Sequence, residues 1–439
     1  MKPINIGLLG IGTVGSGTFA VLKRNQQEIA RRAGREIVIK IIADRDIDKA
    51  RSIVGDDSTL ITSDANEVVI HPDVDIVVEL IGGYSAAKDL TLKAIENGKH
   101  VVTANKAMLA SHGTEIFAAA EKQGVMVAFE AAVAGGIPII KALREGLTAN
   151  CIEWIAGIIN GTGNFILSEM RSKGLSFDTV LEQAQKLGYA EADPTFDIEG
   201  IDAAHKISIM ASIAFGISIQ FDKVYTEGIT KLTGEDISYA EELGYRIKLL
   251  GITKKTPKGI ELRVHPTLIP SRRLIANVEG VMNAVVVKGD AVGPTLYYGP
   301  GAGAEPTASA VVADLVDVTR MHTADPKQRV PHLGVQPNLL LDIPILAMEE
   351  VETSYYLRLQ ALDRPGVLAD ITCILAELEI SIDAMVQKEP KKNEEQVDII
   401  VLTHLSVEKN INAAIAKIEE LPSVMGEITR IRLEELSSK

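Results

Sequence analysis

A short apolar run near the start of the chain ends in a glycine-rich turn, and a helical pattern follows directly. The run spans Ile4 to Leu9, and the turn is Gly10-Ile11-Gly12-Thr13-Val14-Gly15. In a G-x-G-x-x-G turn the first glycine makes the tight bend, the second lets a pyrophosphate approach the backbone, and the third lets the helix pack on the strand. The pattern predicts a strand–turn–helix unit that binds a dinucleotide. A turn of the same shape with a purely structural role is the alternative.

The residues that follow the second predicted strand bear on which dinucleotide is preferred. The strand Val38 to Ala43 is followed by Asp44 and Arg45. An acid at this position favours the free 2′-hydroxyl of NAD, whereas an arginine accommodates the 2′-phosphate of NADP. Because the chain has both, the sequence leaves the choice open, with a slight preference for NADP through Arg45. Alternatively, Asp44 and Arg45 form a solvated pair in a turn and do not contact a cofactor.

Further strands alternate with helices after this point. Ile76 to Ile81 and His100 to Thr103 are predicted strands, and a helix is predicted between them. Such alternation predicts a parallel, doubly wound sheet of the α/β class. Lys106 directly follows the second of these strands, at the carboxyl edge where ligands of such sheets bind. We expect Lys106 to belong to a site, although a solvated lysine is equally compatible with the pattern.

An acid-rich loop leads into an almost wholly apolar helix between Gly188 and Phe215. From Ile207 onward the helix is apolar on every side, which predicts that it is buried. Asp202 and Lys206 are four residues apart and therefore share one helical face. Most such pairs are solvated and contribute little to stability, but a surface pair rarely begins so apolar a helix. Both a site role and an ordinary ion pair therefore remain open.

Two further loops contain small residues. Glu130 to Pro138 carries one acid among exposed carbonyl groups, and such oxygen atoms can hold a hard cation. A tight crossover between domains is the simpler interpretation of that loop. Gly299 to Pro306 is also glycine-rich and leads into a helix over Thr307 to Met321, which we expect to return to the first domain. A glycine-rich loop at a helix N-terminus is a second candidate contact for an anion or cofactor.

The pattern changes twice along the chain. From about Ile137 strands and helices no longer alternate, which predicts an α+β domain. His322 to Glu350 is irregular and contains prolines, as is typical of a linker. The remaining residues follow the order βαββαβ, which is ferredoxin-like.

Charge and composition exclude several classes of partner. A net charge of −14 argues against nucleic acid and anionic membranes. No apolar run approaches the roughly 18 residues of a membrane span, because Glu130 and Lys141 interrupt the longest candidate. Two cysteines, Cys151 and Cys373, provide no disulfide framework and suggest a reducing compartment. We therefore expect a cytoplasmic protein.

Five segments together resemble homoserine dehydrogenases, and the resemblance extends over the whole chain. They are GLLGIGTVGSG at Gly7 to Gly17, VVTANKAML at Val101 to Leu109, EAAVAGGIPI at Glu130 to Ile139, NGTGNFIL at Asn160 to Leu167, and LGYAEADPTFDIEGIDAAHK at Leu187 to Lys206. The last is the most specific. LDRPGVLADIT at Leu362 to Thr372 resembles an ACT domain, a module that usually senses amino acids.

The resemblance implies reduction of L-aspartate 4-semialdehyde to L-homoserine by NADPH or NADH, in the route to threonine, methionine and isoleucine. It also implies feedback regulation through the ACT domain, with threonine as a possible effector, and a homodimer or homotetramer. The implied domains are a Rossmann-type NAD(P)-binding domain over 1–136 completed by the helix 306–321, a catalytic, substrate-binding and dimerisation domain over 137–305, a linker over 322–350, and an ACT regulatory domain over 351–439.

The resemblance assigns roles residue by residue. The implied catalytic residues are Lys206 and Lys106, and the implied substrate-binding residues are Glu191 and Asp202. The implied cofactor-binding residues are Gly10, Gly12, Thr13, Val14, Gly15, Arg45, Lys106, Gly188 and Gly303. The implied sodium ligands are Glu130, Val133, Gly135 and Ile137.

The chemistry of these residues agrees with the implied reaction. Hydride transfer to an aldehyde leaves negative charge on oxygen, and a positioned ammonium group stabilises that charge and donates the proton. Either Lys206 or Lys106 can provide this ammonium group. A semialdehyde dehydrogenase that acylates a cysteine is one alternative, but Cys151 begins an apolar strand and Cys373 lies in the predicted sensor helix. A catalytically inactive regulator that binds nucleotides and amino acids is another.

Overall fold

The structure, a computed structural model, describes residues 2–55, 59–388 and 396–437 of the chain. The chain forms two compact units, each assembled from three separate segments. The first comprises Met1–Gly161, Asp202–Val224 and Val281–Ile343, and the second comprises Thr162–Ile201, Tyr225–Gly280 and Pro344–Lys439. Segments far apart in the sequence therefore share a core in each unit.

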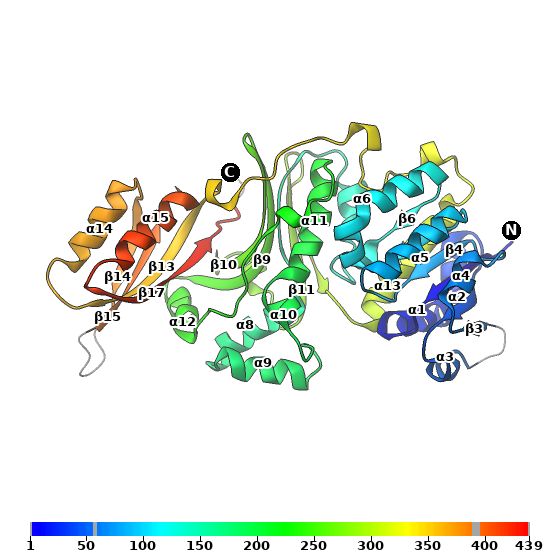
Figure 1. Ribbon diagram of the computed structural model, residues 1–439, viewed down its shortest axis with the longest axis horizontal. Helices are drawn as coiled ribbons and strands as arrows, with labels where there is room; N and C mark the ends of the chain where they lie inside the picture. Colours follow the sequence, from blue (N-terminus) through cyan, green and yellow to red (C-terminus); the bar gives the residue numbers. More distant parts are fainter. Residues whose placement is uncertain (1, 56–58, 389–395, 438–439) are drawn as a thin grey trace. The chain divides into compact units, whose positions relative to one another are not determined.

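A sheet of six parallel strands forms the centre of the first unit (Figure 1). In spatial order the strands are β3 (Leu60–Thr62), β2 (Ile37–Ala43), β1 (Ile4–Leu9), β4 (Ile76–Glu79), β5 (His100–Thr103) and β6 (Val127–Ala128). Every neighbouring pair is parallel, as the alternation of strands and helices predicts. The strand order reverses between β1 and β4, and ligands of such sheets bind at the carboxyl ends beside that reversal.

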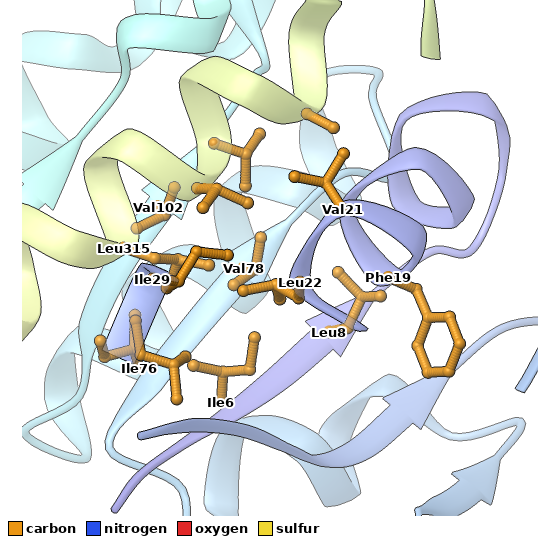
Figure 2. Packing of buried hydrophobic residues seen from close by; sticks show 14 of the residues in the cluster. Ile6, Leu8, Phe19, Val21, Leu22, Ile29, Ile76, Val78, Val102 and Leu315 are labelled. Atoms are coloured by element: carbon orange, nitrogen blue, oxygen red, sulfur yellow. The ribbon is translucent and has the colours of Figure 1, made fainter. Parts of the chain in front are cut away.

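Two groups of helices pack beside this sheet. One group consists of α1 (Thr13–Arg24), α2 (Gln26–Ala33) and α13 (Ala304–Met321), and the other of α4 (Ala65–Ile70), α5 (Ser85–Glu96) and α6 (Lys106–Gln123), while α3 (Ile47–Val54) follows β2. Figure 2 shows Leu8 of β1, Val78 of β4, Leu22 of α1 and Leu315 of α13 in one buried apolar cluster. Helix α13 thus shares the core of a sheet that lies far earlier in the sequence.

The rest of the first unit contains three antiparallel strands and the apolar helix. The strands are β7 (Ile152–Ile158), β11 (Met282–Gly289) and β12 (Gly293–Pro300), with β11 between the other two. A short helix, α7 (Ile139–Lys141), precedes β7. Helix α11 (Ile201–Phe215) is buried along almost its whole length, as its apolar pattern predicts.

The second unit contains the C-terminal βαββαβ fold. Its elements are β13 (Glu352–Leu362), α14 (Val367–Glu377), β14 (Ile382–Gln387), β15 (Gln396–Thr403), β16 (Ser406–Val407), α15 (Glu408–Glu419) and β17 (Val424–Leu433). The four long strands lie in the order β17-β13-β15-β14, and α14 and α15 cover one face of their sheet (Figure 1). The predicted ferredoxin-like arrangement is confirmed.

The remaining elements of the second unit adjoin this fold. They are α8 (Gly161–Lys173), α9 (Phe177–Lys186), α10 (Thr195–Ile198), β8 (Tyr225–Thr226), α12 (Gly234–Glu242), β9 (Tyr245–Thr256) and β10 (Gly259–Pro270). Strand β10 pairs with β9 on one side and with β17 on the other, where Thr267 lies opposite Arg432 and Leu268 opposite Leu433. The C-terminal sheet therefore continues the sheet of β9 and β10. None of the helices in the described part of the chain is long and apolar enough to cross a membrane.

Candidate active site

Asp202 and Lys206 lie in the first turns of α11 and form a buried ion pair. Lys206 Nζ donates to Asp202 Oδ2 at 2.6 Å and to the Ile159 carbonyl oxygen at 2.7 Å. Asp202 is 3% exposed and Lys206 is 8% exposed. The burial excludes the solvated surface pair that the sequence left open, because two charges are removed from water only where specific partners hold them.

A second lysine reaches the same carboxylate from the parallel sheet. Lys106 begins α6 directly after β5, and its Nζ lies 3.0 Å from Asp202 Oδ1. Asn160, just beyond β7, donates from its Nδ2 to Asp202 Oδ2 at 2.9 Å. The structure therefore brings together Lys106, Asp202 and Lys206, three of the residues to which the sequence assigned a site role.

The electrostatics of this cluster keep Asp202 ionised. Burial by itself raises the pKa of the Asp202 carboxyl group, but the charges of Lys206 and Lys106 and the hydrogen bonds from Lys206 and Asn160 hold it well below its ordinary value. A buried carboxylate between two ammonium groups is a preorganised arrangement of charge. Such an arrangement can stabilise negative charge that develops on a substrate oxygen nearby.

The glycine turn has the geometry that its sequence pattern requires. Gly10 has a φ of 89°, and a Cβ atom on Gly15 would lie 2.1 Å from the Gly10 carbonyl oxygen. A Cβ atom on Gly12 would meet nothing within 4 Å, so the space beside this glycine is open. Thr13 and Val14 begin α1, whose N-terminus faces the same turn. The turn therefore leaves room for a phosphate group at a helix N-terminus.

Asp44 and Arg45 differ in their surroundings. Asp44 Oδ2 accepts the Ile11 N–H at 2.7 Å, and Oδ1 accepts the Asp46 N–H at 2.9 Å. The carboxylate therefore braces the glycine turn and its own loop. Arg45 is exposed.

Gly303, Gly188 and Glu191 lie in different parts of the chain. Gly303, in the first unit, has a φ of 117° and precedes α13. A Cβ atom on Gly17 of α1 would lie 2.4 Å from the Ala304 carbonyl oxygen, so the start of α13 lies directly against α1. Gly188 and Glu191 belong to the second unit, in the loop after α9, where Glu191 is exposed. The roles assigned to these two residues stay predictions.

The loop from Glu130 to Ile137 is buried and strongly bent. Glu130 Oε1 and Oε2 accept the backbone N–H groups of Ile140 and Lys141, each at 2.8 Å, so this side chain caps α7. Gly135 has a φ of 49°, and a Cβ atom on it would lie 2.4 Å from the Gly301 carbonyl oxygen. In the described residues no three acidic, histidine or cysteine side chains gather as a metal site. Any cation here depends on Glu130 and on backbone carbonyl groups, and oxygen ligands of this kind suit a hard ion.

Sequence reasoning missed two buried acids beside these loops. Asp314 of α13 accepts the Glu130 N–H at 2.8 Å, and burial together with the charge of Glu130 raises the pKa of Asp314 to about 7. Glu79, the last residue of β4, is fully buried. The available signal was an acid within an otherwise apolar segment: Glu79 ends the strand Ile76–Glu79, and Asp314 lies among valines, leucines and alanines.

Three family models match the chain. One described as homoserine dehydrogenase covers residues 138–316, one described as the homoserine dehydrogenase NAD binding domain covers residues 10–130, and one described as an ACT domain covers residues 355–423. The homoserine dehydrogenase of Pseudomonas aeruginosa is 63% identical over 437 residues, which cover 100% of each protein. That of Neisseria gonorrhoeae is 62% identical over 99% of this chain and 100% of its own length.

Solved structures agree with the family models. A homoserine dehydrogenase from Thiobacillus denitrificans is similar with a TM-score of 0.95 and 70% sequence identity, over 100% of this chain and 99% of that one. A hyperthermophilic archaeal homoserine dehydrogenase in complex with NADPH has a TM-score of 0.62 and 27% identity, over 72% of this chain and 98% of its own. These matches confirm the resemblance and the fold class expected from the sequence.

Proposed function

The chain belongs to the homoserine dehydrogenase family and is an NAD(P)-dependent oxidoreductase, and from this premise we propose that it reduces L-aspartate 4-semialdehyde to L-homoserine. The proposed biological role is a step on the route to threonine, methionine and isoleucine. The observation that carries the proposal is the buried Asp202 carboxylate between the ammonium groups of Lys106 and Lys206. A carbonyl substrate at this cluster meets positive charge where its oxygen becomes negative.

Lys206 is the proposed acid. A nicotinamide cofactor bound at the glycine turn would supply the hydride. Lys206 stabilises the developing alkoxide and transfers one proton to it, and in the reverse direction it accepts that proton from the hydroxyl group of homoserine. Asp202 and the Ile159 carbonyl oxygen fix the position of the Lys206 ammonium group. Lys106 supplies a second positive charge at the sheet edge where the cofactor and substrate meet.

The proposed contacts to the substrate's α-ammonium group come from Glu191 and Asp202. Among the described residues, Asp202 Oδ2 accepts bonds from both Lys206 and Asn160, whereas Oδ1 is paired with Lys106. A carboxylate oxygen can accept two bonds, so Oδ1 retains capacity for the substrate. Glu191, on an exposed loop, adds a second counter-charge in this proposal.

NADP is the proposed preferred cofactor, and NAD is the proposed alternative cofactor. Both oxygens of Asp44 are engaged by backbone N–H groups of Ile11 and Asp46. Arg45 is exposed and makes no hydrogen bond or ion pair with any residue in the described part of the chain, so its guanidinium group is available to a 2′-phosphate.

Sodium is the proposed ion at the loop of Glu130, Val133, Gly135 and Ile137. The loop is buried and its ligands are oxygen atoms, which supports a hard cation. Steady-state rates in sodium buffers and in tetramethylammonium buffers of equal ionic strength test the requirement. Equal rates would remove sodium from the proposal.

Feedback regulation through the C-terminal domain is also proposed, with threonine as the effector. Arg432 of β17 is fully buried, and it donates to Glu408 of α15 at 2.9 Å and to Glu227 at 2.8 Å. The segment after Glu227 bonds to the acid-rich loop, because the Ile229 N–H donates to the Ile198 carbonyl oxygen at 2.9 Å. A shift of β17 on effector binding thus has a short path of contacts to the loop that carries Glu191.

The test uses the purified full-length protein. NADPH oxidation is followed with L-aspartate 4-semialdehyde, and NADP reduction with L-homoserine, each with and without threonine. We expect turnover in both directions and inhibition by threonine. An absence of turnover with both nicotinamides would overturn the assignment of substrate, and unchanged rates in threonine would overturn the regulatory part alone. Light scattering of the same sample checks the expected homodimer or homotetramer.

A further inference from the structure

Glu79 is a fully buried carboxyl group that the proposed mechanism does not use. It ends β4 at the carboxyl edge of the parallel sheet, next to β5. We propose that Glu79 is a positioning residue that ties two loops of this edge together and thereby holds Lys106 against Asp202. The inference rests on the proposed function, because it concerns the geometry of the same lysine.

One oxygen of Glu79 holds the loop that follows its own strand. Glu79 Oε1 accepts the Ile81 N–H at 3.0 Å and the Gly82 N–H at 3.2 Å. Gly82 and Gly83 have φ values of 70° and 77°, which suit glycine and turn the chain sharply. The carboxyl group therefore satisfies two N–H groups of a turn that has no strand partner there.

The other oxygen holds the loop after the neighbouring strand. Glu79 Oε2 accepts the Thr103 hydroxyl group at 2.6 Å, and Thr103 Oγ1 in turn accepts the Asn105 N–H at 3.0 Å. Asn105 Nδ2 donates to the Gly83 carbonyl oxygen at 2.8 Å, which closes a ring of bonds between the two loops. Asn105 Oδ1 also accepts the Met108 N–H and so caps α6, which begins at Lys106.

These two loops border three parts of the active site. The first of them packs on the glycine turn, because a Cβ atom on Gly10 would lie 3.0 Å from the Leu80 carbonyl oxygen. It ends at Tyr84, whose ring contacts the ring of His205 on α11, with centroids 6.3 Å apart. The second loop leads directly into Lys106, whose Nζ is 3.0 Å from Asp202 Oδ1. Glu79 is thus linked to the glycine turn, to α11 and to Lys106 without belonging to the ion cluster.

The two oxygens of Glu79 accept three hydrogen bonds, which an ionised carboxylate can do without a donor of its own. Burial raises the pKa of Glu79, and the bonds from Thr103, Gly82 and Ile81 oppose that rise. A glutamine has one acceptor oxygen and an amide donor. If its oxygen accepts from Ile81 and Gly82, its NH₂ group faces Thr103 Oγ1, which already accepts the Asn105 N–H. The bond between residues 79 and 103 is then reversed, and the Thr103 hydroxyl hydrogen loses its acceptor.

The test compares Glu79→Gln and Thr103→Val with two other variants. Thr103→Ser keeps the hydroxyl group and serves as the rescue. Asp75→Asn is the matched control, since Asp75 precedes the same strand at its opposite end and accepts the Asn5 N–H at 2.9 Å. For each protein we measure kcat and its pH profile, KM for the semialdehyde, thermal unfolding, and the Kd for NADPH from its fluorescence without substrate.

We expect Glu79→Gln and Thr103→Val to lower kcat about 10- to 100-fold, because a misplaced charged group loses alignment with the reacting atoms. The pH profile of kcat shifts in both variants. The Kd for NADPH changes by a smaller factor than kcat. Lys106 is only one of the proposed cofactor contacts, and the glycine turn is held by its own bonds from Gly10 N–H to Ala43 and from Ile11 N–H to Asp44. The double variant is no slower than the slower single variant, Thr103→Ser stays close to the wild type, and Asp75→Asn keeps its kcat.

Each contrary result is decisive. Wild-type kcat in Thr103→Val would overturn the positioning role even where Glu79→Gln fails to fold. Equal losses of kcat and of NADPH affinity would also overturn it, because they indicate collapse of the cofactor site. An inactive wild-type protein that still binds NADPH would refute the proposed reaction, and this inference would fall with it.

Discussion

Asp202→Asn removes a carboxylate that is paired with both active-site lysines. Asp202 is 3% exposed, and its partners are a buried ammonium group on Lys206 and a partly exposed one on Lys106, whose side chain is 35% accessible. Breaking a buried pair by removing one partner costs about 3–5 kcal/mol. Because water screens Lys106, we expect the lower end of that range, about 3 kcal/mol, in the free energy of unfolding.

The pH dependence of this loss follows from the direction of the pKa shift. The folded-state pKa of Asp202 lies below its unfolded value, so its contribution to stability is fully present above the unfolded pKa and is lost as the pH falls towards the folded one. The difference between wild type and Asp202→Asn should therefore be constant between about pH 6 and 8. It should begin to shrink only below about pH 4, near the ordinary pKa of aspartate.

Urea unfolding followed by circular dichroism at several pH values measures this difference, and kcat is measured in parallel. Asp317→Asn is the control, since Asp317 forms partly exposed pairs with Lys141 and Arg320 and should cost less than about 1 kcal/mol. If Asp202→Asn were no less stable than Asp317→Asn at pH 7, the buried cluster would not have the energetic role derived from its geometry.

Three further predictions concern other residues of the first unit. Lys206→Ala should lower kcat by about 10²- to 10⁴-fold while the Kd for NADPH, measured by fluorescence titration, stays within a few-fold of the wild type; a larger effect on Kd than on kcat would contradict its role as the acid. Arg45→Ala should raise KM for NADPH and leave KM for NADH unchanged in steady-state assays, whereas equal effects on the two would remove Arg45 from the cofactor preference. Asp314→Asn should raise the melting temperature at pH 8 more than at pH 5: the pKa of Asp314 is raised to about 7, so its folded-state stability is present at low pH and lost as the pH rises through that value. A melting temperature that falls equally at both pH values would show that the Asp314 carboxyl group is not held protonated.

The sequence alone determined the features that depend on neighbouring residues. The glycine turn after β1 follows from spacing, because only glycine tolerates the close approach found at Gly15. The parallel sheet follows from alternating strands and helices, and the burial of α11 from its all-round apolar pattern. The pairing of Asp202 with Lys206 also follows from a spacing of four on one helix.

Only the tertiary structure decided which distant residues meet. Lys106 reaches Asp202, and Asp314 reaches Glu130, across long stretches of chain that no local pattern relates. Glu79 was overlooked because an acid at the end of an apolar strand has the same local pattern whether it is solvated or buried among donors. Local spacing specifies the conformation of a few residues, whereas these contacts form only when separate segments pack together and the free energy of burial offsets the entropy of closing the chain between them.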